Sequence, residues 1–97
     1  MPNPDEIVHQ STRLKLMAAL TAASGDGFLE FSRLKVISGA TDGNLGAHLA
    51  TLESAGYVEI VKDLVGKRGR TRVRATRVGR NSLEEHVSYL RSVIDGL

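Results

Sequence analysis

Side chains that could perform catalysis or hold a metal ion are sparse in this sequence. The three histidines, His9, His48 and His86, are far apart in the chain, and cysteine is absent. The closely spaced ligand pairs of zinc sites are therefore missing. The segment GKR at 66–68 lacks the upstream glycine and the serine or threonine that a phosphate-binding loop requires. We therefore expect no enzyme, no cofactor and no metal site.

A row of small and hydrogen-bonding side chains offers a different chemistry. Asn44, His48 and Thr51 recur at i, i+4 and i+7, the spacing of one helix face. In the major groove of DNA, asparagine pairs with adenine through two hydrogen bonds, and threonine offers its hydroxyl or its methyl group. Gly43 and Ala47 lie on the same side and are small enough for close approach to base edges. The row predicts base reading in duplex DNA; the alternative is an ordinary solvated helix face.

Positive charge is concentrated between Lys62 and Arg80. Eight of the 13 lysines and arginines occupy these 19 positions against one acid, Asp63, which gives a local net charge of 8 − 1 = +7. The whole chain carries +2, so the other 78 residues carry +2 − 7 = −5. Such an asymmetry favours a polyanionic partner. The alternative is a solvated basic hairpin that serves solubility.

Two helices are expected before the reading row. Apolar residues from Ile7 to Ala23 follow helical spacing, and a glycine-rich turn ends this first helix. Ser32 is expected to cap a second, short helix that ends at Ser38-Gly39. Phe28 and Phe31 are interpreted as core residues.

The row itself belongs to a third helix that follows after about four residues. Thr41 or Asp42 caps its start, where free backbone N–H groups can point at phosphate, and Gly56 ends it in the left-handed conformation. Asp42 would repel phosphate, so a capping role is assigned to it. The stripe expected to be buried opposite the row consists of Leu45, Leu49 and Leu52.

Residues 57–62 and 70–76 read as two strands of a hairpin, joined by a loop over 63–69. Alternation places three arginines on one face, about 7 Å apart at a rise of about 3.3 Å per residue. Each is expected to reach a different phosphate, and the loop is expected to bend into the minor groove. The basic side chains expected to contact DNA from this hairpin are Lys67, Arg68, Arg70, Arg72 and Arg74. This prediction requires them to be free of acidic partners.

A final helix is expected from Arg77 to about Asp95, capped by Thr76. Its apolar residues repeat with spacing 4, 3, 4, 3, which is a heptad seam. The seam residues are Leu83, Val87, Leu90, Ile94 and Leu97. We expect the seam to pair two copies of the chain, because a 97-residue chain with four aromatic residues offers a thin core. The alternative is that the helix docks on its own domain.

The order of these elements predicts a winged helix-turn-helix, a mainly α fold with a small β-hairpin (α+β) and an added C-terminal helix. Residues 1–76 form the DNA-binding unit, and residues 77–97 add the last helix of the same domain. No apolar stretch is long enough to span a membrane, and the polar start at 1–6 lacks the pattern of a signal peptide. A cytoplasmic location is therefore expected.

Three segments also resemble a known family. The run TDGNLGAHLATLESAGYVEI at 41–60, GKRGRT at 66–71 and TRVGR at 76–80 resemble the single-domain winged-helix regulators related to the MarR and ArsR groups. Arg13-Leu14 fits as well, and the resemblance covers about residues 7–97. It implies a homodimer on operator DNA, with the third helix in the major groove and the last helix pairing the subunits. Carried over by position, the DNA-facing residues would be Thr41, Gly43, Asn44, Ala47, His48 and Thr51, with Arg68, Arg70 and Arg72 from the wing.

The expected function is therefore sequence-specific regulation of transcription on double-stranded DNA, with no effector assigned. One alternative is a protein interaction module in a larger assembly, since this fold also serves that role. The arginine-rich hairpin and the absence of aromatic anchors on the third helix argue against it. An RNA-binding protein is a further alternative, but few aromatic residues are available for base stacking.

Overall fold

The N-terminal segment forms two helices where the sequence predicted one. In the computed structural model, which describes residues 5–97, α1 spans Glu6–His9 and α2 spans Ser11–Ala22. Gln10 is extended between them, and its side chain accepts a hydrogen bond from the backbone N–H of Arg13. The prediction of one continuous helix is wrong because this cap satisfies the first turn of α2 and starts a new helix there.

The second and third helices of the sequence analysis are α3, Phe31–Ser38, and α4, Asp42–Ser54. Glu30 is the N-cap of α3, so the expected cap at Ser32 is wrong, because strand β1, Leu29–Glu30, leads directly into the helix. Gly39 ends α3 with φ 68°, as expected. Thr41 caps α4 by accepting a hydrogen bond from the N–H of Asn44, and Gly56 follows the helix with φ 80°.

A three-stranded antiparallel sheet contains the wing. Strand β2, Val58–Val65, pairs with β3, Arg68–Ala75, and β1 pairs with the other edge of β3. Val65 pairs with Arg68, so the hairpin is longer than predicted and its turn contains only Gly66 and Lys67. Gly66 has φ 63°, and glycine with positive φ at the first turn position is typical of the type II′ turn.

The hydrophobic core lies where α2, α3 and α4 meet the inner face of the sheet. The predicted stripe of α4 is buried, as are Val73 and Ala75 on the inner face of β3. Burying a leucine side chain contributes about 1.5–3 kcal/mol each, so this packing holds α4 against the sheet. The buried core residues are Leu16, Met17, Leu20, Leu34, Leu45, Leu49, Leu52, Val58, Val73 and Ala75.

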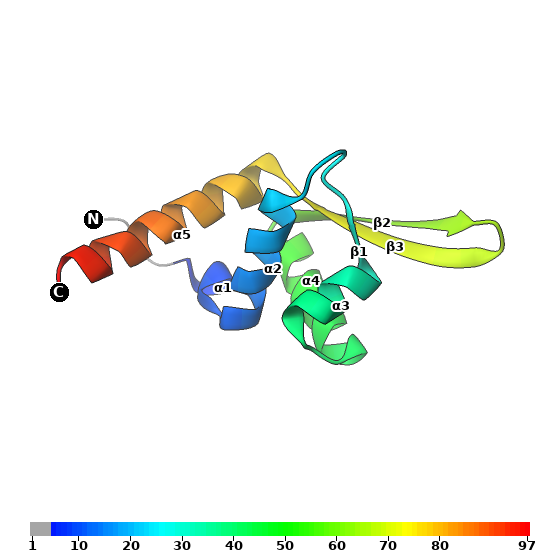
Figure 1. Ribbon diagram of the computed structural model, residues 1–97, viewed down its shortest axis with the longest axis horizontal. Helices are drawn as coiled ribbons and strands as arrows, with labels where there is room; N and C mark the ends of the chain where they lie inside the picture. The colour runs from blue at the N-terminus through cyan, green and yellow to red at the C-terminus, as the bar shows by residue number, and fades with distance from the viewer. Residues whose placement is uncertain (1–4) are drawn as a thin grey trace.

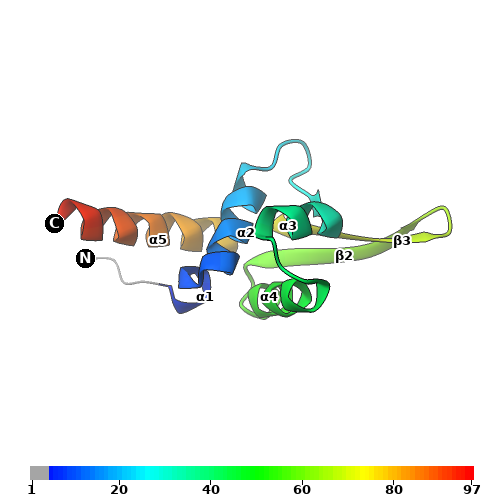
Figure 2. The same cartoon turned by 60° about the horizontal axis from the view of Figure 1, so that its bottom comes forward.

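Helix α5, Arg77–Asp95, begins at Thr76, whose side chain accepts a hydrogen bond from the N–H of Gly79. It projects from one side of the helical body, and the β2–β3 hairpin projects from the other (Figures 1 and 2). The molecule therefore measures 53 × 25 × 22 Å. These elements confirm the predicted α+β winged helix-turn-helix with a C-terminal helix. No helix within residues 5–97 is both long and apolar enough to cross a membrane.

Candidate nucleic-acid interface

The outer face of α4 is open to solvent, as the predicted reading row requires. Gly43, Asn44, Ala47 and Thr51 are exposed, while His48 is half-buried. The Thr51 hydroxyl donates a hydrogen bond to the carbonyl of Ala47 at 3.1 Å, so its oxygen can still accept a hydrogen bond from a partner. Because these side chains are small, this face of α4 can approach the base edges in a major groove closely.

His48 has a partner that the sequence did not reveal. Arg13 on α2 contacts the Nδ1 atom of His48 at 3.1 Å, and its Nε donates to the carbonyl of Ile7 at 2.6 Å. One arginine thus links α1, α2 and α4. A separation of 35 residues in the chain left no local signal for the contact with His48.

The start of α4 carries an ion pair. Lys35 on α3 lies 2.8 Å from the carboxylate of Asp42, the first residue of α4. Thr41 supplies the cap, so the capping role assigned to Asp42 is wrong. The lysine offsets the negative charge that Asp42 places at this helix end.

Three of the four arginines of β3 are paired with acids of β2. Arg70 makes two hydrogen bonds of 2.9 Å with the carboxylate of Asp63, and Arg72 approaches the same carboxylate at 3.0 Å. Arg74 contacts Glu59 at 2.6 Å. The prediction that these three arginines are each free to meet a phosphate is therefore wrong in this structure.

The cause is the register of the hairpin. Asp63 lies directly opposite Arg70, and Glu59 lies opposite Arg74, so acids and arginines share the outer face of the sheet. Oppositely charged residues directly across an antiparallel pair stabilise it by roughly 0.2–1 kcal/mol. The sequence contained a signal for this pairing. If the turn is placed at residues 66–67, the two members of each acid–arginine pair lie at equal distances along the chain from the turn.

Phe28 belongs to this outer face as well. The guanidinium groups of Arg72 and Arg74 each lie 4.6 Å from the centre of its ring, which is within the range of cation–π contacts. Phe28 is half-buried and is not part of the core, so that interpretation is wrong for Phe28, whereas Phe31 packs against the core. Asp26, which precedes Phe28, adds a contact of 3.8 Å to Arg72.

The ion pair between Asp63 and Arg70 persists at neutral pH. Hydrogen bonds from Arg70 lower the pKa of Asp63 to about 2, and the pKa of Arg70 is raised by the same contact. A bidentate arginine–carboxylate contact fixes both side chains in geometry. The outer face of the wing is therefore an ordered ladder of charges.

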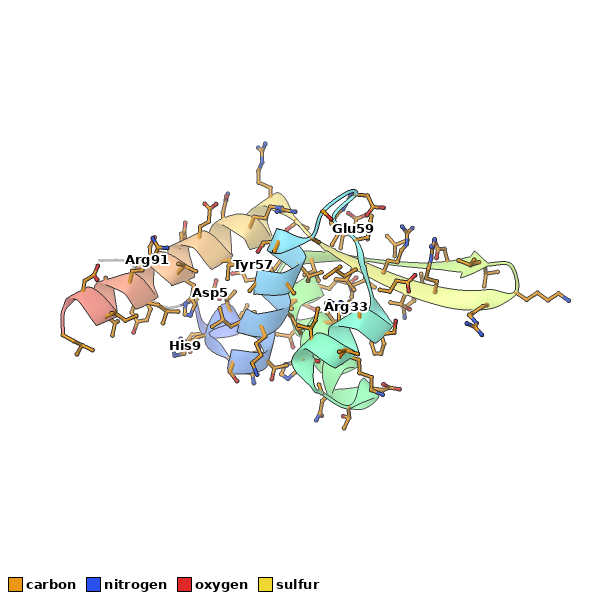
Figure 3. All side chains as sticks on the ribbon, in the orientation of Figure 1. Asp5, His9, Arg33, Tyr57, Glu59 and Arg91 are labelled. Atoms are coloured by element: carbon orange, nitrogen blue, oxygen red, sulfur yellow. The ribbon has the colours of Figure 1, made fainter. Side chains whose placement is uncertain are left out.

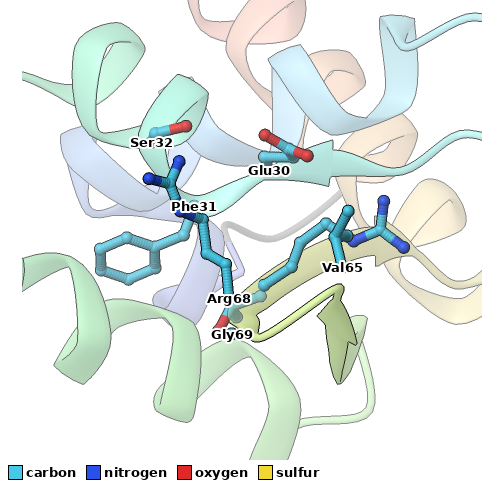
Figure 4. A pocket seen from close by; sticks show the side chains of 8 residues that line it. Glu30, Phe31, Ser32, Val65, Arg68 and Gly69 are labelled. Carbon is cyan, nitrogen blue, oxygen red and sulfur yellow. The ribbon is translucent and has the colours of Figure 1, made fainter.

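Positive charge remains at the end of the wing. Six lysines and arginines lie between residues 58 and 75 against two acids, and Asp26 adds a third, which leaves 6 − 3 = +3. Among residues 5–97, Lys62, Lys67 and Arg68 make no ion pair within 4 Å. A groove runs between the start of α3 and the strands near the wing tip, and Arg68, Phe31 and Ser32 line it (Figure 4).

Ring contacts of His9 on α1 with His86 and Tyr89 on α5 join the two helices. His86 is 0% exposed, and its Nε2 lies 3.3 Å from Nδ1 of His9. Burial and the neighbouring His9 lower the pKa of His86. Tyr89 stacks on His86, and Asp5, near His9 in Figure 3, accepts a hydrogen bond from the Tyr57 hydroxyl. Within residues 5–97, no group of three or more histidine, cysteine, aspartate or glutamate side chains could hold a metal ion.

The heptad seam of α5 divides into two parts. Leu83 packs against the core of its own domain, as the docking alternative foresaw, and Val87 and Leu90 are half-buried. Ile94 is 66% exposed and Leu97 is fully exposed. The second half of the seam therefore projects beyond the body without a partner in the described chain.

Comparison with known proteins agrees with this architecture. A family model described as a winged helix DNA-binding domain matches residues 12–94. The chain therefore belongs to this family of winged-helix DNA-binding proteins.

Individual relatives support the same assignment. An uncharacterized protein of Methanocaldococcus jannaschii is 34% identical over 82 residues, which are 84% of this chain and 86% of that protein. The transcriptional regulator homologue of Pyrococcus horikoshii OT3 is 31% identical, with a TM-score of 0.81 over 95% of this chain and 88% of its own. A MarR family transcriptional regulator from Silicibacter pomeroyi shares the fold at 18% identity, with a TM-score of 0.68 over 90% of this chain and 55% of that one. The likeness to the MarR family regulator is one of fold, and the family assignment rests on the family model and on the relatives above 30% identity.

Proposed function

We propose that the protein binds operator DNA as a homodimer, with α4 in the major groove and the wing tip on the adjacent backbone or minor groove. The observation that carries this proposal is the exposed face of α4 with its small side chains, together with a wing tip whose Lys67 and Arg68 make no ion pair among residues 5–97. Thr41, Gly43, Asn44, Ala47, His48 and Thr51 would face the bases or the backbone next to them.

The ladder of charges gives the basic residues of the wing two different roles. Lys67 and Arg68 supply the phosphate contacts, because no acid competes for them among the described residues. The ion pairs of Arg70, Arg72 and Arg74 help to hold β2 against β3, and the charge of these arginines is balanced by Asp26, Glu59 and Asp63. A phosphate would have to displace Asp63 or Glu59 to contact these three directly.

Dimerisation through the second half of α5 completes the proposal. Leu90, Ile94 and Leu97 lie on one seam, and two antiparallel or crossed copies would bury the apolar surface that one chain leaves exposed. A symmetric dimer places two reading helices on half-sites about 34 Å apart.

Two neighbouring arginines of the same strand face give the sharpest test of this proposal. Binding to a random duplex is measured by fluorescence anisotropy over a range of salt concentrations for the wild type, Arg68→Ala and Arg70→Ala. Each phosphate contact contributes about 0.9 to the slope of log K against log salt. Arg68→Ala should reduce the magnitude of the slope by about 0.9, and Arg70→Ala by clearly less, because Asp63 already holds Arg70.

The possible results separate the parts of the proposal. A wild-type chain that fails to bind duplex DNA at about 50 mM salt would refute DNA binding itself. Equal slope losses in the two variants would show that Asp63 releases Arg70 on DNA, which contradicts the assignment of contacts to the tip alone.

A further inference from the structure

The contact between Arg13 and His48 determines which ring nitrogen of His48 carries hydrogen. A guanidinium group has only N–H donors, so the Nδ1 atom that lies 3.1 Å from Arg13 must accept. A neutral imidazole with an accepting Nδ1 carries its hydrogen on Nε2. Arg13 is itself held by its hydrogen bond to Ile7, which restricts it to this position.

The other nitrogen of His48 is available to a partner outside the chain. Among residues 5–97, no hydrogen bond involves Nε2 of His48, and this atom is not among the buried polar atoms that lack a partner. Nε2 therefore reaches solvent from the face of α4 that also carries Asn44, one helical turn earlier.

We infer that Arg13 is a specificity-determining residue that acts through His48: it fixes the histidine as an N–H donor for an acceptor on a base edge. This inference rests on the proposed DNA binding by α4. Guanine suits such a donor best, because its major-groove edge has two acceptors and no donor, whereas cytosine presents an amino donor. Without Arg13, the imidazole can adopt either tautomer, and an accepting Nε2 would no longer discriminate against cytosine.

The tautomer is tested directly in the full chain. Imidazole 15N–1H correlation spectra distinguish a hydrogen on Nε2 from one on Nδ1. The wild type should show His48 with hydrogen on Nε2, and Arg13→Ala should give a mixture of tautomers. A wild-type His48 with hydrogen on Nδ1, or a tautomer unchanged in Arg13→Ala, overturns the inference.

The predicted base preference is tested by selecting bound sequences from a random duplex pool and measuring the affinity of the protein for the selected sequences. The wild type should prefer guanine over cytosine at one position of each half-site by about three- to tenfold, the range expected of one hydrogen bond. Arg13→Ala and His48→Ala should both lose this preference. His48→Lys carries N–H donors and no acceptor, so in the Arg13→Ala background it should restore the preference for guanine over cytosine.

The double variant Arg13→Ala/His48→Lys keeps the test valid if Arg13→Ala loosens α1, since a guanine preference there shows that the fold still reads DNA. An equal loss of affinity on all sequences in His48→Ala would mean that His48 meets phosphate, which overturns the inference while DNA binding stands. A wild type that binds no duplex removes the proposed function itself, and anisotropy on random DNA detects that result separately.

Discussion

Adding one methyl group at Gly79 should test how closely α5 packs on the rest of the domain, through its effect on stability. It lies in the first turns of α5 and is buried against the segment that leads into β2. A Cβ at this position would overlap the carbonyl oxygen of Tyr57 and lie 2.9 Å from Cε of Met17. That carbonyl cannot move freely, because it accepts the N–H of Thr76 at 3.0 Å.

The expected magnitude for Gly79→Ala combines three effects. Alanine is favoured over glycine in a helix interior by about 1 kcal/mol. Overpacking a filled site costs about 1–3 kcal/mol, and losing the Thr76–Tyr57 hydrogen bond costs roughly 1 kcal/mol more. The helix preference and the lost hydrogen bond offset each other, so the free energy of unfolding should fall by about 1–3 kcal/mol.

Gly46→Ala is the matched control. Gly46 lies inside α4, is exposed, and an added Cβ would meet nothing within 4 Å. The same chemical change should therefore raise stability by up to about 1 kcal/mol. Urea denaturation at one protein concentration, followed by circular dichroism, measures both variants.

The prediction is tested by the signs of the two stability changes, which should be opposite for Gly79→Ala and Gly46→Ala. A difference of about 1–4 kcal/mol between the variants follows from the packing of α5 on Tyr57. If Gly79→Ala stabilised the protein as much as Gly46→Ala, the close approach of α5 to this carbonyl would be refuted.

Two further predictions concern α5. Ile94→Lys should leave the single chain folded, because Ile94 is 66% exposed, and should shift sedimentation equilibrium toward monomer, whereas Ser88→Lys, exposed and outside the seam, should not. A wild type that sediments as a monomer at micromolar concentration would contradict the dimer. Since burial lowers the pKa of His86 below 6.5, the unfolded state binds its proton more readily, and stability that is fully present above pH 6.5 should be lost as pH falls below it. His86→Phe should flatten this part of the stability curve in urea titrations, and an unchanged pH slope would argue against a buried, uncharged His86.

Much of the secondary structure could be predicted because its signals are local. Thr41 and Thr76 cap their helices through hydrogen bonds to residues three positions later, and Gly39 and Gly56 adopt positive φ just after helices. The apolar stripe of α4 follows from helical periodicity alone. These features determine which residues form helices and which face of α4 remains exposed.

The candidate site was predicted less completely, because its charges are arranged by pairing across the sheet. The prediction of which face of α4 is exposed was correct. Whether Arg70 is free, however, depends on which residue of β2 lies opposite it. A change of one residue in register would move Asp63 to the other face of the sheet. The turn at Gly66 and Lys67 determines that register.

The sequence by itself therefore determined α3, α4, α5 and the β2–β3 hairpin, their order and the excess of positive charge on the wing. Only the tertiary structure decided that Arg13 contacts His48, that His86 is buried against His9, and that Arg70, Arg72 and Arg74 are already paired. The reason is physical: caps and periodicity act over three or four residues, whereas these contacts join residues that only the packing of distant segments brings together.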